Sequence, residues 1–349
     1  MEQLNIAGRA IGAASAPYVI AEIGSNHNGD MQLCRRLVDA AKAAGAHAVK
    51  LQAWTRDSLI SSAEYARNTR YAAERKAPSL EDAVMQYQMT PDRLREIGRY
   101  CEDRGVVCFS SCFSRQEVDE LESLGTPAYK IASMDVNHLP LLEYVGRTGK
   151  PVLLSTGMAT LGEVERALGV LRDAGAGGVA LLHCVSLYPC PPEAVHLNML
   201  ETWRRAFGVP VGYSDHTLGS AVPIAAAALG ACVIEKHFTL DTAMEGWDHA
   251  LSADPGELRA IVEGTDAAWR ALGSAARRVS PDEVTKRVAF RRRMVARRAL
   301  RQGEGITAED VEFKRPGTGI QPDELAYVVG RKVVRDVAVD EELEWADLG

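Results

Sequence analysis

The chain has 349 residues, of which 46% are hydrophobic and 25% are charged, as is typical of soluble globular proteins. This length predicts one large domain accompanied by a smaller one. The formal net charge of −7 disfavours a nucleic-acid partner unless a strong basic face is present. No apolar run is long enough to span a bilayer, and Met1–Ala16 lacks the basic and apolar regions of a signal peptide.

The seven cysteines are an odd number, and none of them forms a Cys-x-x-Cys pair. Most lie in apolar segments, where a reduced cysteine behaves as a small hydrophobic residue. We therefore expect a cytoplasmic protein without disulfides.

Between residues 18 and 272 the chain alternates short apolar runs with amphipathic segments. The apolar runs are almost continuous, as expected for strands buried on both faces of a parallel sheet. We predict eight strands, at Tyr18–Ile23, His47–Ala53, Val106–Cys112, Ala128–Ser133, Pro151–Thr156, Val179–Val185, Pro210–Ser214 and Ala231–Phe238.

The amphipathic segments between these strands carry helix start signals. Ser114 precedes Glu117 by three residues, and Thr160 precedes Glu163 by the same interval, which is the spacing of a capping box. Eight strand–helix units with mostly short links predict the α/β class and a (β/α)8 TIM barrel. An open doubly wound sheet with the same elements is the structural alternative.

One connection is unusually long, because residues 54–89 separate the second strand from the next predicted helix. Loops of this length commonly cover an active site. We expect the second half of this loop, Ser79–Tyr87, to form an extra helix.

The composition changes near the C-terminus. We predict a barrel domain over 1–275, a linker over 276–290 and a compact module of short strands and turns over 291–349. Arginines are frequent at the start of this module. Because the whole chain is acidic, we interpret them as a solvated face and expect no nucleic-acid partner.

Polar groups stand at the carboxyl ends of the predicted strands, where TIM-barrel enzymes place their active sites. A complete ring of buried polar groups costs desolvation energy, so it implies a polar ligand. The ring consists of Glu22, Lys50, Gln52, Ser110, Ser111, Lys130, Ser133, Ser155, Thr156, Ser186, Tyr188, Ser214, Asp215, His216, Glu235 and His237.

Two histidines in this ring are candidate metal ligands. His216 ends the seventh strand and His237 ends the eighth, so a closed barrel brings both imidazoles to one side of its mouth. Such a pair suits a divalent ion such as Mn²⁺, or Mg²⁺ or Zn²⁺. The alternative is two unconnected hydrogen-bonding histidines. His183 and His249 are lesser candidates.

Two lysines in the ring are candidate anion ligands. Lys50 and Lys130, on the second and fourth strands, are placed to converge on a phosphate as point charges. The chain has no phosphate-binding loop or dinucleotide fingerprint, so we do not expect a nucleotide.

These motifs together strongly resemble those of the sialic acid (N-acetylneuraminate) synthase family. The C-terminal segment Lys314–Gly319 is similar to the antifreeze-like (SAF) domain of that family. The barrel motifs that carry the resemblance are Ile20–Gly24, Val49–Gln52, Tyr129–Ser133, Gly149–Met158, Leu182–Cys184, Ser214–Thr217 and Ile234–Thr239.

The resemblance implies a condensation of phosphoenolpyruvate, a sugar aldehyde and water, which gives a sialic-acid-like 2-keto acid and phosphate. It implies that His216 and His237 hold the metal and that the protein is a swapped homodimer in which Arg315 reaches the partner's site. The implied catalytic residues on the sugar side are Glu22, Gln52, Tyr188 and Asp248. The implied substrate-binding residues are Lys50, Ser111, Lys130, Ser133, Ser155, Ser186, Ser214 and Arg315.

The chain departs from the family pattern on the sugar side. Ser186 replaces the usual Asn, Ser111-Cys112 replaces Thr-Pro, and Trp247 replaces the Pro of Gly-Pro-Asp. The segment Lys76–Leu80 lacks an Asn that would meet an N-acetyl group. These departures leave the acceptor less well defined than the reaction. N-acetylmannosamine is the default acceptor, and a bacillosamine- or altrose-derived hexose or a non-acetylated aldose stays open.

Two other classes of function compete with this reading. A metal-dependent aldolase or hydrolase on the same barrel needs no lysine pair and releases no phosphate from phosphoenolpyruvate. A non-catalytic sugar-binding or regulatory protein predicts the loss of metal or acid–base residues, yet Glu22, His216 and His237 are all present.

Overall fold

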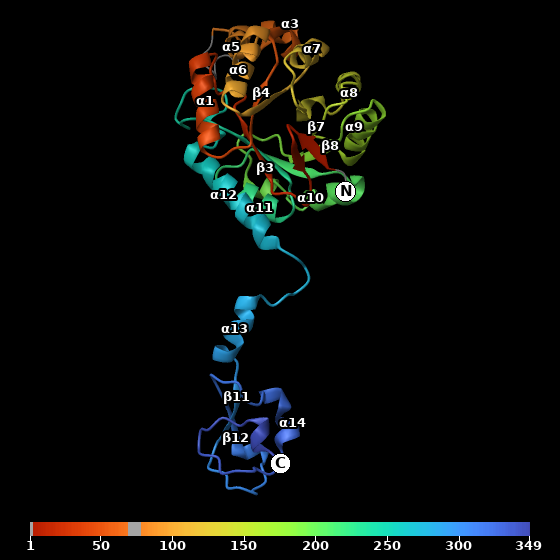
Figure 1. Cartoon of the computed structure of the whole chain (residues 1–349). Coiled ribbons are helices and arrows are strands. Elements are labelled where there is room, and N and C mark those ends of the chain that lie inside the picture. Colours follow the sequence, from red (N-terminus) through yellow and green to blue (C-terminus); the bar gives the residue numbers. More distant parts are fainter. Residues whose placement is uncertain (1–2, 69–77) are drawn as a thin grey trace. The chain divides into compact units, whose positions relative to one another are not determined.

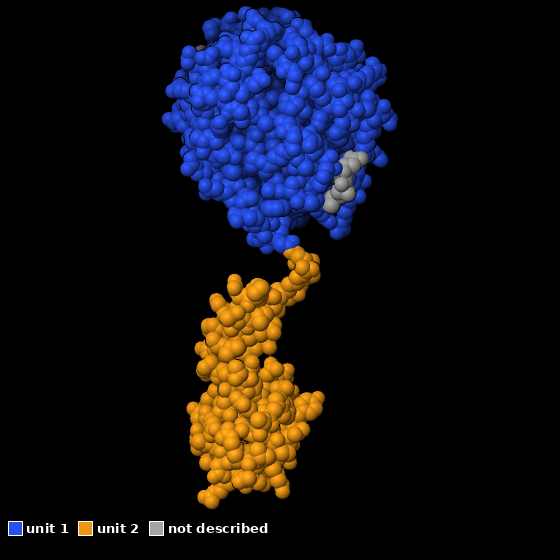
Figure 2. Space-filling view, viewed as in Figure 1, with its two compact units in different colours: residues 1–273 blue, residues 274–349 orange. Residues whose placement is uncertain are grey.

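A computed structural model of the chain describes residues 3–68 and 78–349. The chain divides into two compact units, Met1–Gly273 and Ser274–Gly349 (Figures 1 and 2). The larger unit contains the predicted barrel, and the smaller one contains the predicted C-terminal module.

Eight parallel strands close into a barrel in the order β10-β3-β4-β5-β6-β7-β8-β9. The pairing of β10 with both β3 and β9 closes the sheet, which confirms the TIM barrel and excludes the open-sheet alternative. The eight strands are β3 (Tyr18–Glu22), β4 (Ala48–Gln52), β5 (Val107–Ser111), β6 (Tyr129–Ile131), β7 (Val152–Ser155), β8 (Val179–Cys184), β9 (Val211–Asp215) and β10 (Val233–His237).

Helices surround the barrel (Figure 1). Both predicted capping boxes are present, at Ser114 before α7 and at Thr160 before α9. The surrounding helices are α1 (Met31–Ala43), α6 (Pro91–Asp103), α7 (Arg115–Ser123), α8 (Leu139–Gly146), α9 (Leu161–Asp173), α10 (Met199–Phe207), α11 (Ala221–Ala228) and α12 (Pro255–Leu272).

The alternation of side chains along each strand decides which residues face the barrel interior. In β3, Val19 and Ala21 pack in the large core that includes helix residues, whereas Ile20 belongs to a second, smaller core. Glu22 has the same parity as Ile20, so it points inward at the carboxyl end of the strand. The polar residues predicted for the site therefore recur at i and i+2, as in Lys50 and Gln52.

The N-terminal segment forms a hairpin that the sequence analysis missed. β1 (Leu4–Ile6) pairs antiparallel with β2 (Arg9–Ile11). Leu4, Ile6 and Ile11 are buried in the same core as Tyr18, the first residue of β3. The hairpin thus completes the hydrophobic core on the side of the barrel away from the polar ring, and its short alternating runs gave only a weak signal.

The long loop after β4 contains three described helices, α2 (Arg56–Leu59), α3 (Ser62–Arg67) and α5 (Leu80–Tyr87). The helix expected over Ser79–Tyr87 is confirmed, and Ser79 caps it by accepting from the backbone N–H of Asp82. A separate hydrophobic cluster holds this loop together, with Trp54, Tyr65, Leu80, Val84 and Phe113 at its centre.

The smaller unit has its own hydrophobic core and a two-stranded antiparallel sheet, β11 (Arg293–Ala296) with β12 (Val311–Lys314). Its helices are α13 (Pro281–Phe290) and α14 (Leu325–Val328). The segment predicted as a linker over 276–290 contains α13, which the sequence analysis did not expect although Ser280 and Glu283 form a capping box before it. Among the described residues, no helix has both the length and the apolar character needed to cross a membrane.

His27 makes the stability of the barrel sensitive to acid. Burial, with a contribution from Arg93, lowers the pKa of His27 to about 4, and its Nδ1 accepts a hydrogen bond from the Gly29 N–H at 3.0 Å. The unfolded chain takes up this proton near the ordinary pKa of 6.5, whereas the folded chain does not. Stability contributed by neutral His27 is therefore present above about pH 6.5 and is lost as the pH falls toward 4.

We predict that urea denaturation gives a lower free energy of unfolding at pH 5 than at pH 7, with His27 contributing about 1–2 kcal/mol of the loss. His27→Asn places an amide oxygen where Nδ1 accepts but cannot be protonated, so its pH dependence is flatter. An equally steep pH dependence in His27→Asn contradicts the assignment.

Candidate active site

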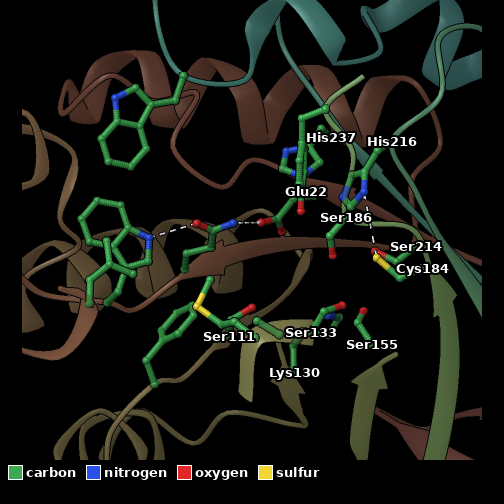
Figure 3. A pocket seen from close by; sticks show the side chains of 18 of the residues that line it. Glu22, Ser111, Lys130, Ser133, Ser155, Cys184, Ser186, Ser214, His216 and His237 are labelled. Atoms are coloured by element: carbon green, nitrogen blue, oxygen red, sulfur yellow. Dashed lines mark hydrogen bonds between the residues drawn. The ribbon is translucent and has the colours of Figure 1, made fainter. Parts of the chain in front are cut away.

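A cavity of about 630 Å³ opens at the carboxyl ends of the barrel strands. Figure 3 shows polar side chains from different strands meeting in it. Twelve of the fourteen predicted site residues line the cavity: Glu22, Lys50, Gln52, Ser111, Lys130, Ser133, Ser155, Ser186, Tyr188, Ser214, His216 and His237.

Four buried charges form what we call the charged floor of the cavity: Glu22, Lys50, Lys130 and Glu235. Lys50 Nζ lies 2.8 Å from Glu22 Oε2 and 3.9 Å from Glu235 Oε2. Lys130 Nζ lies 3.7 Å from Glu235 Oε1. The two lysines thus converge as predicted, and in this structure they converge on Glu235.

Burial and mutual interactions together set the protonation of the charged floor. Burial raises the pKa of Glu22 to about 7, with Lys50 opposing the shift and Glu235 reinforcing it. Burial alone would lower the pKa of Lys50, but the carboxylates of Glu22 and Glu235 outweigh it and raise the value. Burial lowers the pKa of Lys130. A carboxyl group with a pKa near neutrality is suited to take up and release protons.

Beside the charged floor lies a small cradle of hydroxyl groups. Ser133 Oγ accepts a hydrogen bond from the Gly157 N–H at 2.9 Å. A Cβ at Gly157 would lie 2.4 Å from Ser186 Oγ and 2.8 Å from Ser133 Oγ, so only glycine leaves this space open. Ser155 Oγ is buried without a hydrogen-bond partner among the described residues. Hydroxyls beside two lysines are typical of a site for an oxyanion such as phosphate.

The two predicted metal ligands lie side by side. The imidazole centroids of His216 and His237 are 5.4 Å apart. Two imidazoles that bind one ion at about 2.1 Å in neighbouring positions have centroids roughly 5 Å apart, so the spacing fits a shared ion.

The hydrogen bond of His216 and the protonation of His237 also suit a metal. His216 Nδ1 lies 2.9 Å from the Val185 carbonyl oxygen. Because a carbonyl oxygen can only accept, Nδ1 carries the proton, and the lone pair of the neutral ring is on Nε2. Burial, together with the charges of His216 and Lys50, holds the pKa of His237 well below its usual value. His237 can therefore present a neutral nitrogen, which is the form that binds metals. At His216 burial works in the same direction, but the interaction with Cys184 outweighs it and raises the pKa.

Two predicted site residues do not line the cavity. Asp248 stands behind His237, with its Oδ2 3.7 Å from His237 Nδ1, as carboxylates behind metal-binding histidines often do. Arg315 belongs to the smaller unit, where its guanidinium lies over the ring of Phe290. The lesser metal candidates have structural partners instead, since His183 bonds to the Val195 carbonyl and His249 to Thr239 Oγ1.

The sequence analysis missed several residues of the cavity. Glu235 appeared in the polar ring without a role, although it stands two residues before His237 and therefore on the same inward face. Cys184 Sγ lies 4.0 Å from His216 Nδ1. One side of the cavity is apolar, and this wall gave no signal because its residues are scattered along the sequence; it includes Trp54, Leu59, Ile60, Leu80, Phe113 and Trp247.

The sequence analysis noted that Lys76–Leu80, in the loop after β4, lacks an Asn that would meet an N-acetyl group, and the structure tests this only in part. Within Lys76–Leu80, residues 76 and 77 lie outside the described residues, while Leu80 lines the cavity. Asn68 from the same loop also lines the cavity, together with Glu64. Sequence reasoning overlooked Asn68 because it lies eight residues before the segment that the family pattern indicated.

A buried ion pair stands behind the two histidines. Lys236 Nζ lies 2.8 Å from Asp215 Oδ2, and both side chains are almost fully buried. Asp215 Oδ1 also accepts from the Tyr213 hydroxyl and the Thr217 N–H. Since Asp215 precedes His216 and Lys236 precedes His237, this pair ties together the strand ends that carry the two imidazoles.

Comparison with known proteins identifies the family. The model of the NeuB family matches residues 37–277, and that of the SAF domain matches residues 291–349. The chain belongs to the NeuB family. Its barrel and its C-terminal SAF domain are those expected from the resemblance.

Individual relatives span nearly the whole chain of this NeuB-family protein. An uncharacterised protein of Methanocaldococcus jannaschii is 41% identical and is matched over 100% of this chain and 99% of its own length. N,N'-diacetyllegionaminic acid synthase of Legionella pneumophila is 38% identical over 96% of this chain and 95% of its own. The crystal structure of N-acetylneuraminic acid synthetase from Leptospira borgpetersenii, in complex with citrate, is 29% identical with a TM-score of 0.73, covering 83% of this chain and 97% of that one.

We predict that Lys236→Met destabilises the barrel by about 3–5 kcal/mol, because Asp215 is left buried without its cation. Urea denaturation at pH 7 measures the loss. The double variant Asp215→Asn with Lys236→Met should lose less stability than the sum of the two single variants. Additive losses would show that the two side chains do not act as a pair.

Proposed function

We propose that this NeuB-family enzyme condenses phosphoenolpyruvate with a sugar aldehyde, forms a carbon–carbon bond and releases phosphate. The observation that carries the proposal is the convergence of Lys50 and Lys130 on one point beside the Ser133–Gly157–Ser186 cradle, with two histidines at the same mouth. The two lysines supply positive charge for an enol phosphate, and the two histidines beside them provide a site where a carbonyl can be activated.

The residues of the cavity divide the work between the two substrates. Lys50, Lys130 and the cradle hydroxyls bind the phosphate and carboxylate groups of phosphoenolpyruvate and orient its enol carbon. As that carbon attacks the aldehyde, positive charge develops at the carbon that bears the phosphate. Water adds there, and Glu22, whose pKa is raised to about 7, is placed to take its proton. Phosphate then leaves toward the two lysines.

A divalent ion, with Mn²⁺ as the first candidate and Mg²⁺ as another, is part of the proposal. His216 and His237 would hold it, and Asp248 would orient His237 through the 3.7 Å contact. When bound, such an ion supplies Lewis-acid polarisation of the aldehyde oxygen. Gln52 and Tyr188, which line the same cavity, would hold the sugar against that centre.

The acceptor and the assembly also belong to the proposal. The Legionella relative is named for one sugar acid and the Leptospira structure for another, so the family assignment leaves several acylamino hexoses as acceptors, with N-acetylmannosamine as the default. We further propose a domain-swapped homodimer in which Arg315 completes the partner's site. The seven cysteines are all free, which supports a cytoplasmic location.

The competing classes of function fit the cavity less well. A metal-dependent aldolase or hydrolase binds no enol phosphate, so two buried lysines beside a hydroxyl cradle would have no role in it. A non-catalytic binding protein has no need of a carboxyl group whose pKa is raised to about 7 beside paired imidazoles.

The assay that tests the proposal measures phosphate release from phosphoenolpyruvate with Mn²⁺ across a panel of aldoses, followed by mass spectrometry. We predict sugar-dependent release, a product heavier than its acceptor by a pyruvyl unit, and loss of activity with EDTA that Mn²⁺ restores. Phosphate release that does not depend on a sugar would indicate hydrolysis and would overturn the proposal.

We predict that His237→Ala reduces Mn²⁺-dependent turnover by at least about 10²-fold, since the contact it removes acts on developing charge, while the barrel still folds. His196→Asn, which changes an exposed histidine, is the matched control and should keep full activity. Unchanged activity in His237→Ala refutes the metal assignment.

Gly157→Ala tests the cradle separately. The added methyl group takes the space between Ser133 and Ser186, so we predict that the KM for phosphoenolpyruvate rises about 10-fold or more. Gly162→Ala in α9, where a Cβ meets nothing within 4 Å, is the control. An unaltered KM in Gly157→Ala would place the anion elsewhere.

A further inference from the structure

The two histidines proposed as metal ligands stand just beyond the paired part of their strands. In the register of β9 with β10, the last pair at the carboxyl ends is Asp215 with Lys236. His216 and His237 each follow that pair by one residue. His237 is also paired with Glu22 of β3, whereas His216 lies past the end of β9. The ladder between β9 and β10 therefore stops short of the two imidazoles, and other contacts must fix the spacing of their rings.

The last pair of the ladder, Asp215 with Lys236, points away from the cavity. Each of the two stands between residues that line the cavity without lining it itself. Because neighbours along a strand point to opposite faces, both side chains lie on the outward side of the barrel, where each is 1% exposed. Asp215, which was expected in the polar ring at the mouth, lies behind it instead.

This ion pair also holds the backbone next to His216. Asp215 Oδ1 accepts a hydrogen bond from the Thr217 N–H at 2.8 Å, and Lys236 Nζ donates to the Thr217 carbonyl. The carbonyl of His216 accepts from the Cys190 N–H at 2.8 Å. We call the Asp215–Lys236 pair with its two bonds to Thr217 the backbone clamp. Through this clamp, the residue after His216 is tied directly to β10, the strand that carries the other imidazole.

A tyrosine completes the surroundings of Asp215. The Tyr213 hydroxyl donates to Asp215 Oδ1 at 2.9 Å, and Tyr213 is itself buried. One carboxylate thus receives a hydroxyl, a backbone N–H and an ammonium group, the last at 2.8 Å. Three donors in different directions fix both the position and the orientation of the carboxylate. Removing one donor therefore loosens the clamp without abolishing it.

Stability alone does not account for charges at this place. The desolvation of two buried charges offsets most of their attraction, and apolar side chains of similar volume often stabilise a core as well or better. Apolar side chains cannot, however, hold the N–H and the carbonyl of Thr217. What the ion pair adds to packing is a fixed backbone beside His216, and residues that fix the ligands of a metal control its affinity.

We infer that Asp215 and Lys236 are positioning residues that set the spacing of the two imidazoles and thereby the affinity of the site for a divalent ion. Ligands already held at the right distance lose little freedom when the ion binds, so the binding is tighter. The clamp keeps the imidazole centroids 5.4 Å apart. The inference rests on the proposed function, because it takes His216 and His237 as the ligands of the catalytic metal.

The test measures the Kd of Mn²⁺ for the full-length protein without substrates, by electron paramagnetic resonance of the free ion. Lys236→Met removes the ammonium group, and we predict that the Kd rises about 10- to 100-fold. Asp215→Asn keeps an oxygen for the Thr217 N–H but loses the ion pair, and should raise the Kd about 10-fold. Because both imidazoles remain, kcat should recover toward the native value when Mn²⁺ is saturating.

A matched variant controls for the loss of any buried cation. Lys150→Met makes the same substitution two residues before β7, where Lys150 Nζ lies 2.7 Å from Glu122 Oε1, and it should leave the Kd of Mn²⁺ unchanged. Thermal unfolding verifies that each variant folds. If Lys236→Met does not, Tyr213→Phe removes only one donor from Asp215 and should raise the Kd about 2- to 5-fold.

Failure of the clamp and failure of the proposed function give different results. A native Kd in the folded clamp variants overturns the positioning role, and so does an equal rise in Lys150→Met. A kcat that stays low at saturating Mn²⁺ contradicts a role confined to holding the metal ligands. If His237→Ala binds Mn²⁺ as tightly as the native protein, or if no sugar yields a pyruvyl adduct, the proposed function itself is wrong.

Discussion

The site depends on four charges that the barrel keeps out of water together. Glu22, Lys50, Lys130 and Glu235 come from four strands and are each almost fully buried. Any one of them alone would be strongly destabilising, because a buried charge loses its hydration. Their alternating signs make the arrangement tolerable, and the same burial raises the pKa of Glu22 to about 7. Both the stability of the barrel and the proposed chemistry therefore require these four charges to be buried close together.

Closure of the sheet brings these four charges together, because it places strands that are distant in the sequence around one mouth. β10 lies beside β3, so Glu235 and His237 from the end of the barrel sequence reach Glu22 from its beginning. Behind them the Asp215–Lys236 ion pair joins the outward side of β9 and β10. The inward face carries the ligands and the outward face fixes their spacing, which follows from the alternation of side chains along a strand.

The residues proposed to carry out the reaction and those that line the apolar side of the cavity come from different parts of the chain. The groups proposed for phosphoenolpyruvate and metal stand mostly at or directly after strand ends, where the backbone is fixed by the sheet. The apolar side of the cavity comes mainly from the long loop after β4 and from the loop around Trp247. Loops vary without disturbing the barrel, so a family can keep one reaction and change its acceptor. The Trp54–Gln52–Glu22 hydrogen bonds join the two parts in this chain.

The sequence by itself determined the eight strands, the barrel and most of the polar ring, because buried strands are continuous apolar runs and the polar groups stand at the carboxyl ends of those runs. It missed the β1–β2 hairpin and α13, whose short or exposed segments carry weak periodicity. Only the tertiary structure decided that Glu235 joins both lysines and that Trp54 and Trp247 stack. Those contacts link residues about 100 to 200 positions apart in the printed sequence, and their partners are fixed by closure of the barrel and by loop packing, which no local pattern encodes.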